Sequence, residues 1–269
     1  MGAREGRELT MTVVSDQLPP PDGSESGTEG ATQARFRSDV TVELVRASAR
    51  DGDVVWSARV STAGEQSLED LDADPAKSRG LITYLMKNRH GTPFEHNSMT
   101  FLVSAPIFVF REFHRHRVGW SYNEESARYR ELAPVFYIPG PDRRLIQVGK
   151  PGSYDFIEGT QEQTALAHEA TIRACQTAYS SYQEMLNAGI AREVARGVLP
   201  VATFSTMYAT CNARSLMSFL SLRTKREGSV FPSYPQREIE MVAEKMEQHF
   251  AELMPITYQA FVAAGRVSP

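Results

Sequence analysis

The stretch from Arg111 to Arg130, REFHRHRVGWSYNEESARYR, concentrates side chains that could bind an anionic ligand. Arginine presents a planar fork of donors that fits a phosphate and also stacks on aromatic rings. Glu124 and Glu125 can accept hydrogen bonds from sugar hydroxyls or ring N–H groups. Aromatic residues are interleaved with these groups. The pattern therefore favours a site for a nucleotide or phosphorylated ligand over a solvated, salt-bridged helix face.

An apolar run opened by Ser104-Ala105-Pro106 precedes this stretch and is typical of a helix start with proline in the first turn. We expect a hydrophobic helix that carries the cationic cluster at its C-terminal end and stops before Gly119. On such a helix Arg111 and Arg115 share a face, and the side chains of residues 115–117 fan around the axis.

Two later segments hold further candidates for phosphate binding. Arg192 and Arg196 lie four residues apart on an expected helix face, so they could clamp a phosphate. An ion pair with Glu193, or no role at all, is an equally weighted reading. Asn212 precedes an expected helix that contains Arg214, and local sequence favours a structural N-cap role for it over a ligand role.

The histidines and cysteines do not predict a metal site or a thiol nucleophile. The four histidines His90, His96, His114 and His116 lack metal-ligand spacing and an acidic partner pattern. Cys175 falls on the apolar stripe of a long expected helix with no neighbouring base, which favours an inert core cysteine. Ser126 has no histidine beside it in sequence, so an anchoring hydrogen bond is the better interpretation of its hydroxyl.

Composition narrows the function class. The chain has 269 residues, of which 41% are hydrophobic, and a net charge of −4, which argues against a general nucleic-acid binder. Two cysteines predict no disulfide framework. No apolar run is long enough to span a bilayer, and the start lacks a secretory pattern, so we expect a cytoplasmic protein.

The expected organisation is a disordered tail over residues 1–35, rich in Pro, Ser, Gly and Glu, and one folded domain over 36–269. Hydrophobic periodicity predicts the elements of that domain. Strands are expected at 41–45, 54–60, 98–103 and 201–210, with an extended segment at 133–141. Helices are expected at 77–88, 161–187, 190–199 and 214–223, and in a last segment that includes residues 239–253. This mixture predicts a single α+β domain with helices packed on a sheet.

The segment Arg115-His116-Arg117 followed by Ser-Tyr-Asn-Glu-Glu-Ser-Ala-Arg-Tyr closely resembles the signature of flavin-dependent thymidylate synthases. The resemblance extends in order over about residues 40–262. It is carried by His90-x-Thr92-Pro-Phe-Glu-His, Ala105-Pro-Ile-Phe-Val, Arg192-Glu-Val-Ala-Arg-x-Val-Leu-Pro, Asn212-Ala-Arg-Ser-Leu and Gln236-x-Glu-Ile.

The resemblance implies a central, mainly antiparallel sheet flanked by long helices, and the reductive methylation of dUMP to dTMP. In that family methylenetetrahydrofolate supplies the carbon, FAD carries the hydride and NADPH reduces the flavin. A homotetramer with active sites shared between subunits is also implied, with neither nucleic acid nor membrane as a partner.

Matching positions assign the expected site residues. By similarity, FAD would contact Thr92 of a neighbouring subunit and Arg115, His116, Arg117, Glu124, Asn212, Ala213, Arg214 and Ser218. The nucleotide dUMP would contact Glu112, Phe113, His114, Arg115, Glu124, Glu125, Ser126, Ala127, Arg128, Arg196 and Arg223. Arg223 matches the family arginine that polarises the uracil ring, a catalytic role that needs no protein thiol.

This sequence departs from the family pattern at several positions. Eight residues, not seven, separate Arg117 from Ser126, and we expect the extra one to bulge around Gly119-Trp120. Glu112 stands where many members have glutamine, and Ser218 replaces a flavin-contacting asparagine. Tyr234 replaces a histidine in an enlarged loop.

Two alternative readings remain. One is a flavin- or nucleotide-binding protein of the same fold without methyl transfer, and the other is a nucleic-acid-binding module. A yellow preparation favours a flavoprotein, and a colourless one that shifts an oligonucleotide favours the second alternative.

Overall fold

The computed structural model describes residues 34–64, 75–151 and 153–269. Its helices are α1 (Asp51–Ala63), α3 (Pro75–Lys87), η1 (Thr92–Glu95), α4 (Ile107–Phe113), α5 (Gln161–Asn187), α6 (Arg192–Ala195), η2 (Arg196–Val198), α7 (Ala213–Arg223), α8 (Arg237–Leu253) and α9 (Pro255–Ala263). Its strands are β1 (Arg35–Arg37), β2 (Thr41–Ser48), β3 (Ser98–Pro106), β4 (Trp120–Glu124), β5 (Val135–Tyr137), β6 (Ile146–Lys150), β7 (Ser153–Ile157) and β8 (Phe204–Cys211). Residues 1–33 lie outside the described residues, so the expected tail stays a prediction.

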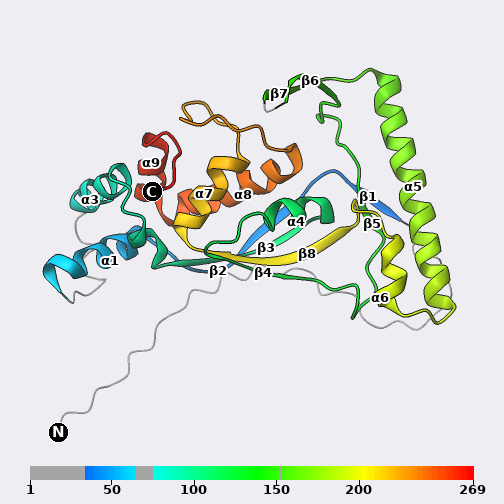
Figure 1. Cartoon of the computed structure of the whole chain (residues 1–269), viewed down its shortest axis with the longest axis horizontal. Helices are drawn as coiled ribbons and strands as arrows, with labels where there is room; N and C mark the ends of the chain where they lie inside the picture. The colour runs from blue at the N-terminus through cyan, green and yellow to red at the C-terminus, as the bar shows by residue number, and fades with distance from the viewer. Residues whose placement is uncertain (1–33, 65–74, 152) are drawn as a thin grey trace, which may run out of the picture. The chain divides into compact units, whose positions relative to one another are not determined.

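A four-stranded antiparallel sheet in the order β2-β3-β8-β4 forms the centre of the domain. β3 alternates buried and half-buried side chains, as expected for a strand with one face on the core. Figure 1 shows α4, α7 and α8 on the same side of this sheet. The core between them holds fully buried side chains that include Phe101, Phe113, Met207, Phe219 and Phe250. The predicted α+β class with a central antiparallel sheet is confirmed.

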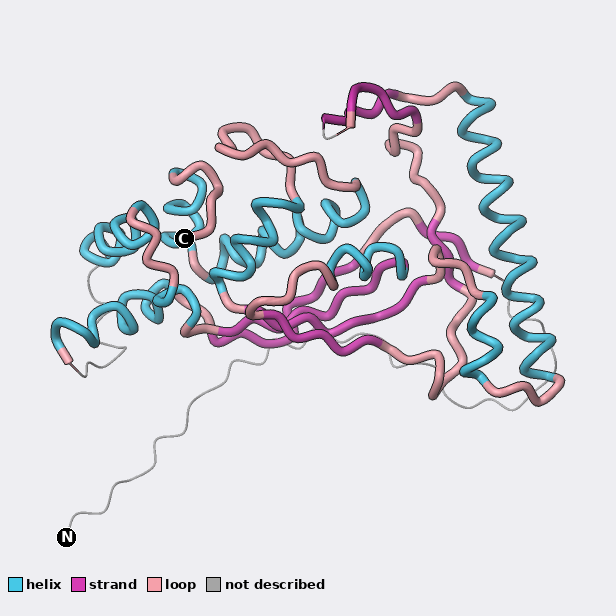
Figure 2. The backbone as a smooth tube through the Cα atoms, in the orientation of Figure 1, coloured by secondary structure: helices cyan, strands magenta, loops and turns pink. Residues whose placement is uncertain are grey.

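Smaller elements surround this core. β1 and β5 pair in parallel, and β6 and β7 form an antiparallel hairpin. Figure 2 traces the long helix α5 running beside α6 and the β1–β5 pair. Among the described residues, no helix combines the length and apolar character that a membrane crossing requires.

The expected strand at 54–60 is wrong, because these residues belong to helix α1. Val54 and Val55 are fully buried, and the β-branched side chains that suggested a strand are instead the core-facing residues of the helix. The Asp51 carboxylate accepts hydrogen bonds from the backbone N–H groups of Ile256 and Thr257, which ties the start of α1 to the start of α9. The strand β4, the β6–β7 hairpin and α9 were not predicted.

The long helix α5 spans the predicted residues 161–187. Its start is fixed by a capping box, in which the Thr160 hydroxyl accepts from the Gln163 N–H and the Gln163 side chain accepts from the Thr160 N–H. The chain leaves the helix through Gly189, whose φ of +78° favours glycine.

Candidate functional site

The Arg-His-Arg segment lies in a turn and not on a helix, contrary to the sequence-based expectation. α4 ends at Phe113, with His114 as its C-cap, and β4 begins at Trp120. Arg111 and Arg115 therefore do not share a helix face, and residues 115–117 do not fan around a helix axis. At the N-terminal end of α4, strand β3 continues to Pro106, and the helix begins at the next residue. The cationic residues lie between the end of one short helix and an edge strand of the sheet.

Tyr122 ties β4 to the turn that follows α4. Its hydroxyl lies 3.0 Å from the Phe113 carbonyl and 2.9 Å from the His116 carbonyl, so its single proton is shared between them or donated to one of them. The Phe113 ring also stacks on Phe219 of α7 at 4.9 Å between centroids. A strand and a helix thus hold the turn from two sides.

Arg223, at the last position of α7, contacts both the end of α4 and the turn that follows it. Its Nη1 lies 2.5 Å from Oε2 of Glu112, its Nη2 donates to the Glu112 carbonyl at 3.3 Å, and its Nε donates to Nε2 of His116 at 3.0 Å. The guanidinium group has five N–H donors, so these three contacts leave two of them for a ligand. The Arg223 side chain is only 12% exposed, and burial together with these contacts holds it in one position.

Burial, with the positive charge of Arg223 as a second cause, lowers the pKa of His116 to about 4. The imidazole is therefore neutral at physiological pH, with Nε2 as the acceptor of the Arg223 hydrogen bond. A neutral ring against the guanidinium avoids like-charge repulsion at this point. Of the two side chains, Arg223 therefore carries the positive charge and His116 carries none.

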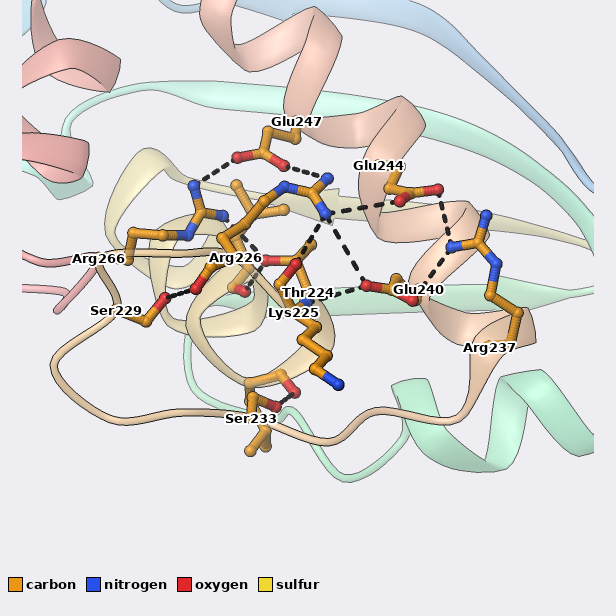
Figure 3. A network of polar contacts seen from close by, with 12 residues as sticks. Thr224, Lys225, Arg226, Ser229, Ser233, Arg237, Glu240, Glu244, Glu247 and Arg266 are labelled. Carbon is orange, nitrogen blue, oxygen red and sulfur yellow. Dashed lines mark hydrogen bonds and ion pairs between the residues drawn. The ribbon is translucent and has the colours of Figure 1, made fainter. Parts of the chain in front are cut away.

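The loop that follows Arg223 is tied to α8 by ion pairs, shown in Figure 3. Arg226 contacts three carboxylates of α8, the nearest being Glu247, 3.0 Å from its Nη2. Glu247 also pairs with the buried Arg266 at 2.6 Å. The backbone N–H of Lys225 donates to Glu240 at 2.9 Å. These contacts fix the chain directly after the candidate catalytic arginine.

The N-terminus of α7 packs against the other end of the turn. Asn212 is the predicted N-cap, since its side chain accepts from the Ser215 N–H at 2.9 Å. The Ser215 hydroxyl donates to the Val118 carbonyl at 2.9 Å. Gly119 has a φ of +69°, and a Cβ there would lie 2.1 Å from the Ser215 hydroxyl oxygen. A side chain at this position would require an unfavourable positive φ and would push aside the Ser215 hydroxyl that bonds the Val118 carbonyl.

A cleft of about 560 Å³ opens at this junction. It is lined by Arg89, Glu95, Val118, Gly119, Asn212, Arg214, Ser215, Ser218, Ser268 and Pro269. It unites three of the residues expected to hold FAD, Asn212, Arg214 and Ser218. Arg214 is held by Glu95 at 2.6 Å and by the carbonyl of Pro269 at 2.7 Å. Ala213 is fully buried, and its N–H donates to Asn97.

A second cavity, of about 320 Å³, gathers residues expected to hold dUMP. It is lined by Ile107, Glu124, Glu125, Ser126, Ala127, Leu132, Arg196, Leu199 and Ser205. Among its polar members, Ser205 was not predicted, because a lone serine in a strand carries no sequence signal. Burial raises the pKa of Glu124, and the Ser205 hydroxyl, then the charge of His114, act in the opposite direction. The cavity combines a cation, carboxyl groups and hydroxyls, which suits a sugar phosphate.

Among the other predicted ligands, Phe113 is fully buried in the core and offers no surface to a ligand, whereas His114 is exposed. Arg115 and Arg117 are exposed, and neither guanidinium group forms an ion pair with a described residue. Arg128 pairs with Glu193 at 3.0 Å, and both side chains are largely exposed, so a ligand phosphate could replace the carboxylate at small cost. The Ser126 hydroxyl accepts from the Arg128 N–H at 3.3 Å.

Within one chain the predicted residues form separate groups. The Arg196 cavity and the Arg214 cleft share no lining residue, and Arg223 lines neither. Thr92 lines a third cavity with His90 and His96. The Glu193 carboxylate pairs with Arg128 and not with its helix neighbours, which decides against an ion pair within the Arg192–Arg196 segment.

Thiol and metal chemistry find no support in the part of the chain that the structure describes. Cys175 and Cys211 are both 2% exposed, and burial raises the pKa of each thiol. A thiol that stays protonated is a poor nucleophile. No group of three or more His, Cys, Asp or Glu side chains suited to a metal ion occurs among residues 34–64, 75–151 and 153–269.

Comparison with known proteins identifies the family to which this chain belongs. The family profile described as "Thymidylate synthase complementing protein" matches residues 43–256. A protein of Streptomyces avermitilis named flavin-dependent thymidylate synthase is 68% identical over 234 residues, which are 87% of this chain and 95% of that protein. A protein of the same name from Tropheryma whipplei is 57% identical over 87% of this chain and 97% of its own length.

Solved structures match as well. A UMP/dUMP methylase, PolB, from Streptomyces cacaoi, bound with 5-Br UMP, aligns with a TM-score of 0.81 at 55% identity. This match covers 88% of the present chain and 100% of that one. The same methylase bound with 5-Br dUMP aligns with a TM-score of 0.81 over 87% of this chain.

Proposed function

Because this chain belongs to the flavin-dependent thymidylate synthase family of enzymes, we propose that it converts dUMP to dTMP by reductive methylation. Family membership confirms the resemblance inferred from the sequence motifs. In the proposed reaction methylenetetrahydrofolate is the carbon donor and NADPH the reductant. Bound FAD would supply the hydride.

The observation that carries the proposal is the 320 Å³ cavity that unites Arg196 with Glu124, Glu125 and Ser126. A nucleoside monophosphate has an anionic end and a sugar with hydroxyl groups. Arg196 offers a charged donor for the phosphate, and the carboxyl groups offer acceptors for sugar hydroxyls or ring N–H groups. Arg128, released from its exposed pair with Glu193, is a second candidate donor for the phosphate.

We assign the 560 Å³ cleft to the flavin dinucleotide. Arg214, Asn212 and Ser218 supply polar groups along its wall, and Gly119 lets the turn pack closely on Ser215 of α7 beside them. Arg115 and Arg117 are exposed and free of ion pairs with described residues, so they are open to the pyrophosphate of FAD. We assign these residues to holding and orienting the flavin.

Arg223 is the residue to which we assign activation of the pyrimidine. Its two free N–H donors would face the uracil ring and stabilise the negative charge that develops as C5 becomes nucleophilic. Glu112 and His116 hold the guanidinium in place, so little reorganisation is needed when the charge develops. The burial of both thiols supports a mechanism that uses no cysteine.

We also propose that the active enzyme is a homotetramer with shared sites. On a single chain the Arg196 cavity, the Arg214 cleft and Thr92 lie in three different places. Association of several copies would bring groups of this kind together. Light scattering coupled to gel filtration should give a mass of four chains, and a monomer with full activity would contradict the proposal.

The test of the function is tritium release from 5-³H-dUMP by flavin-loaded enzyme with methylenetetrahydrofolate and NADPH. We expect tritium release that requires the bound flavin, methylenetetrahydrofolate and NADPH together. Flavin-loaded protein that binds dUMP but releases no tritium would favour a nucleotide-binding flavoprotein without methyl transfer.

Methylation of UMP is a second candidate activity. It is favoured by the likeness to a UMP/dUMP methylase at 55% identity. Parallel assays with UMP and dUMP would decide between a strict deoxynucleotide enzyme and one that accepts both sugars. A kcat/KM for UMP within tenfold of that for dUMP would establish the second activity.

A further inference from the structure

Ser205 is a buried polar residue with an unmet hydrogen-bonding capacity. Its side chain is 3% exposed, and its hydroxyl makes no hydrogen bond with a described residue within the usual distance and angle limits, although it lies close enough to the Glu124 carboxyl group to oppose the rise in that group's pKa. Buried hydroxyl groups in proteins almost always have a partner, because an unpaired one costs stability. A buried hydroxyl without a complete hydrogen bond at a cavity wall indicates that its partner comes into position when a ligand binds. That partner is either the ligand itself or a neighbouring side chain that moves when the cavity fills.

The strand register places Ser205 beside Glu124. Glu124 of β4 pairs with Met207 of β8, and Ser205 lies two residues further along the same face of β8. On its other side Ser205 pairs with Ala105 of β3, a small residue without a polar side chain. The Glu125 N–H donates to the Thr206 carbonyl at 2.8 Å and keeps the two strands together at this level.

We propose that Ser205 is a positioning residue of the nucleotide cavity, whose hydroxyl donates a hydrogen bond to the Glu124 carboxylate when nucleotide is bound and directs that carboxylate at the ligand. This inference rests on the proposed function. The groups that face Glu124 are His114 from the turn after α4, its neighbour Glu125, Arg196 from η2 and Ser205 from β8. Among them, Ser205 is a neutral hydrogen-bond donor, so its replacement by alanine leaves the net charge of the cavity unchanged.

The burial of Glu124 gives the proposal a measurable consequence. Burial raises the pKa of Glu124, and the Ser205 hydroxyl counteracts that rise. If the hydroxyl is removed, the carboxyl group takes up a proton at higher pH. The acid limb of the pH profile of dUMP binding should therefore move to higher pH in Ser205→Ala and return in Ser205→Thr, which restores a hydroxyl.

Thr203 provides a matched control close to the start of the same strand. It is 1% exposed, and its hydroxyl donates to the Pro200 carbonyl at 2.7 Å, so its hydrogen bond is structural and complete. Thr203→Val should lower the melting temperature and leave the Kd for dUMP unchanged. Ser205→Ala should change the melting temperature of the ligand-free enzyme little, because the hydroxyl that it removes makes no complete hydrogen bond there.

The experiment measures melting temperature and dUMP affinity of the full-length, flavin-loaded enzyme across pH 5–9. We expect Ser205→Ala to weaken dUMP binding about tenfold, as for the loss of one hydrogen bond to a charged group. Unchanged affinity and unchanged pH dependence in Ser205→Ala would overturn the proposal, as would a loss of stability like that of Thr203→Val without a change in affinity. If the wild-type enzyme itself neither binds dUMP nor releases tritium, the proposed function fails and this inference fails with it.

Discussion

The Nε of Arg223 lies 3.0 Å from Nε2 of His116, and the same guanidinium group holds Glu112 at 2.5 Å. This arrangement joins the last residue of α7 to the turn that carries the Arg-His-Arg segment. A residue so fixed can act on a bound pyrimidine without first being ordered.

Arg223→Ala should lose turnover while it largely keeps FAD. Removal of one preorganised charged donor typically costs about 10²–10³-fold in kcat. Flavin absorbance of the purified variant measures cofactor content, and tritium release measures turnover. A colourless apoprotein would show that Arg223 serves the flavin instead of the pyrimidine.

His116 should make the folded protein sensitive to acid. Its pKa in the folded state is about 4, against 6.5 for the free side chain, so the unfolded chain binds a proton first as the pH falls. The stabilising contribution is complete above about pH 6.5 and is lost as the pH falls toward 4. The melting temperature of wild type should therefore drop more than that of His116→Asn across this window. A constant difference between the two proteins from pH 7 to pH 4 would contradict this.

Gly119→Ala should destabilise the protein by about 1–3 kcal/mol and reduce its FAD content. The new Cβ would meet the Ser215 hydroxyl oxygen at 2.1 Å and would require a positive φ. Gly80→Ala in α3 is the control, since a Cβ there has no neighbour within 4 Å and alanine favours the helix. Chemical denaturation gives the two free energies of unfolding. Equal stability of both variants would refute the role given to Gly119.

Cys175→Ser should retain activity. The thiol is buried in α5, burial raises its pKa, and no step of the proposed mechanism needs it. Tritium release should stay within a few fold of wild type, with the melting temperature lowered by the polar replacement. A folded but inactive variant would restore a thiol mechanism.

Local signals predicted much of the fold. The capping box at Thr160 and the glycine at 189 bound α5, and both can be recognised in the sequence. Asn212 as the N-cap of α7 was likewise predicted. In contrast, Val54 and Val55 suggested a strand, since β-branched residues fit either a strand or the buried side of a helix, and only their tertiary contacts decide.

The site was harder to predict, because its contacts join segments far apart in sequence. Family motifs selected residues 124–127 and Arg196, which the 320 Å³ cavity brings together, but not Ser205 in the same wall. They gave no sign that Arg223 pairs with Glu112, or that the Tyr122 hydroxyl bonds the turn after α4. Such contacts depend on the positions of whole elements, and sequence spacing does not encode those directly.

The regular pairing of β4 bears on where its chain can change in length. Trp120 to Glu124 pair with Cys211 to Met207 without a bulge, so the bulge expected around Gly119-Trp120 does not extend into the strand. An insertion inside β4 would reverse which side chains face each side of the sheet, and Glu124 would point away from the 320 Å³ cavity. A change in the length of the preceding turn leaves that alternation intact.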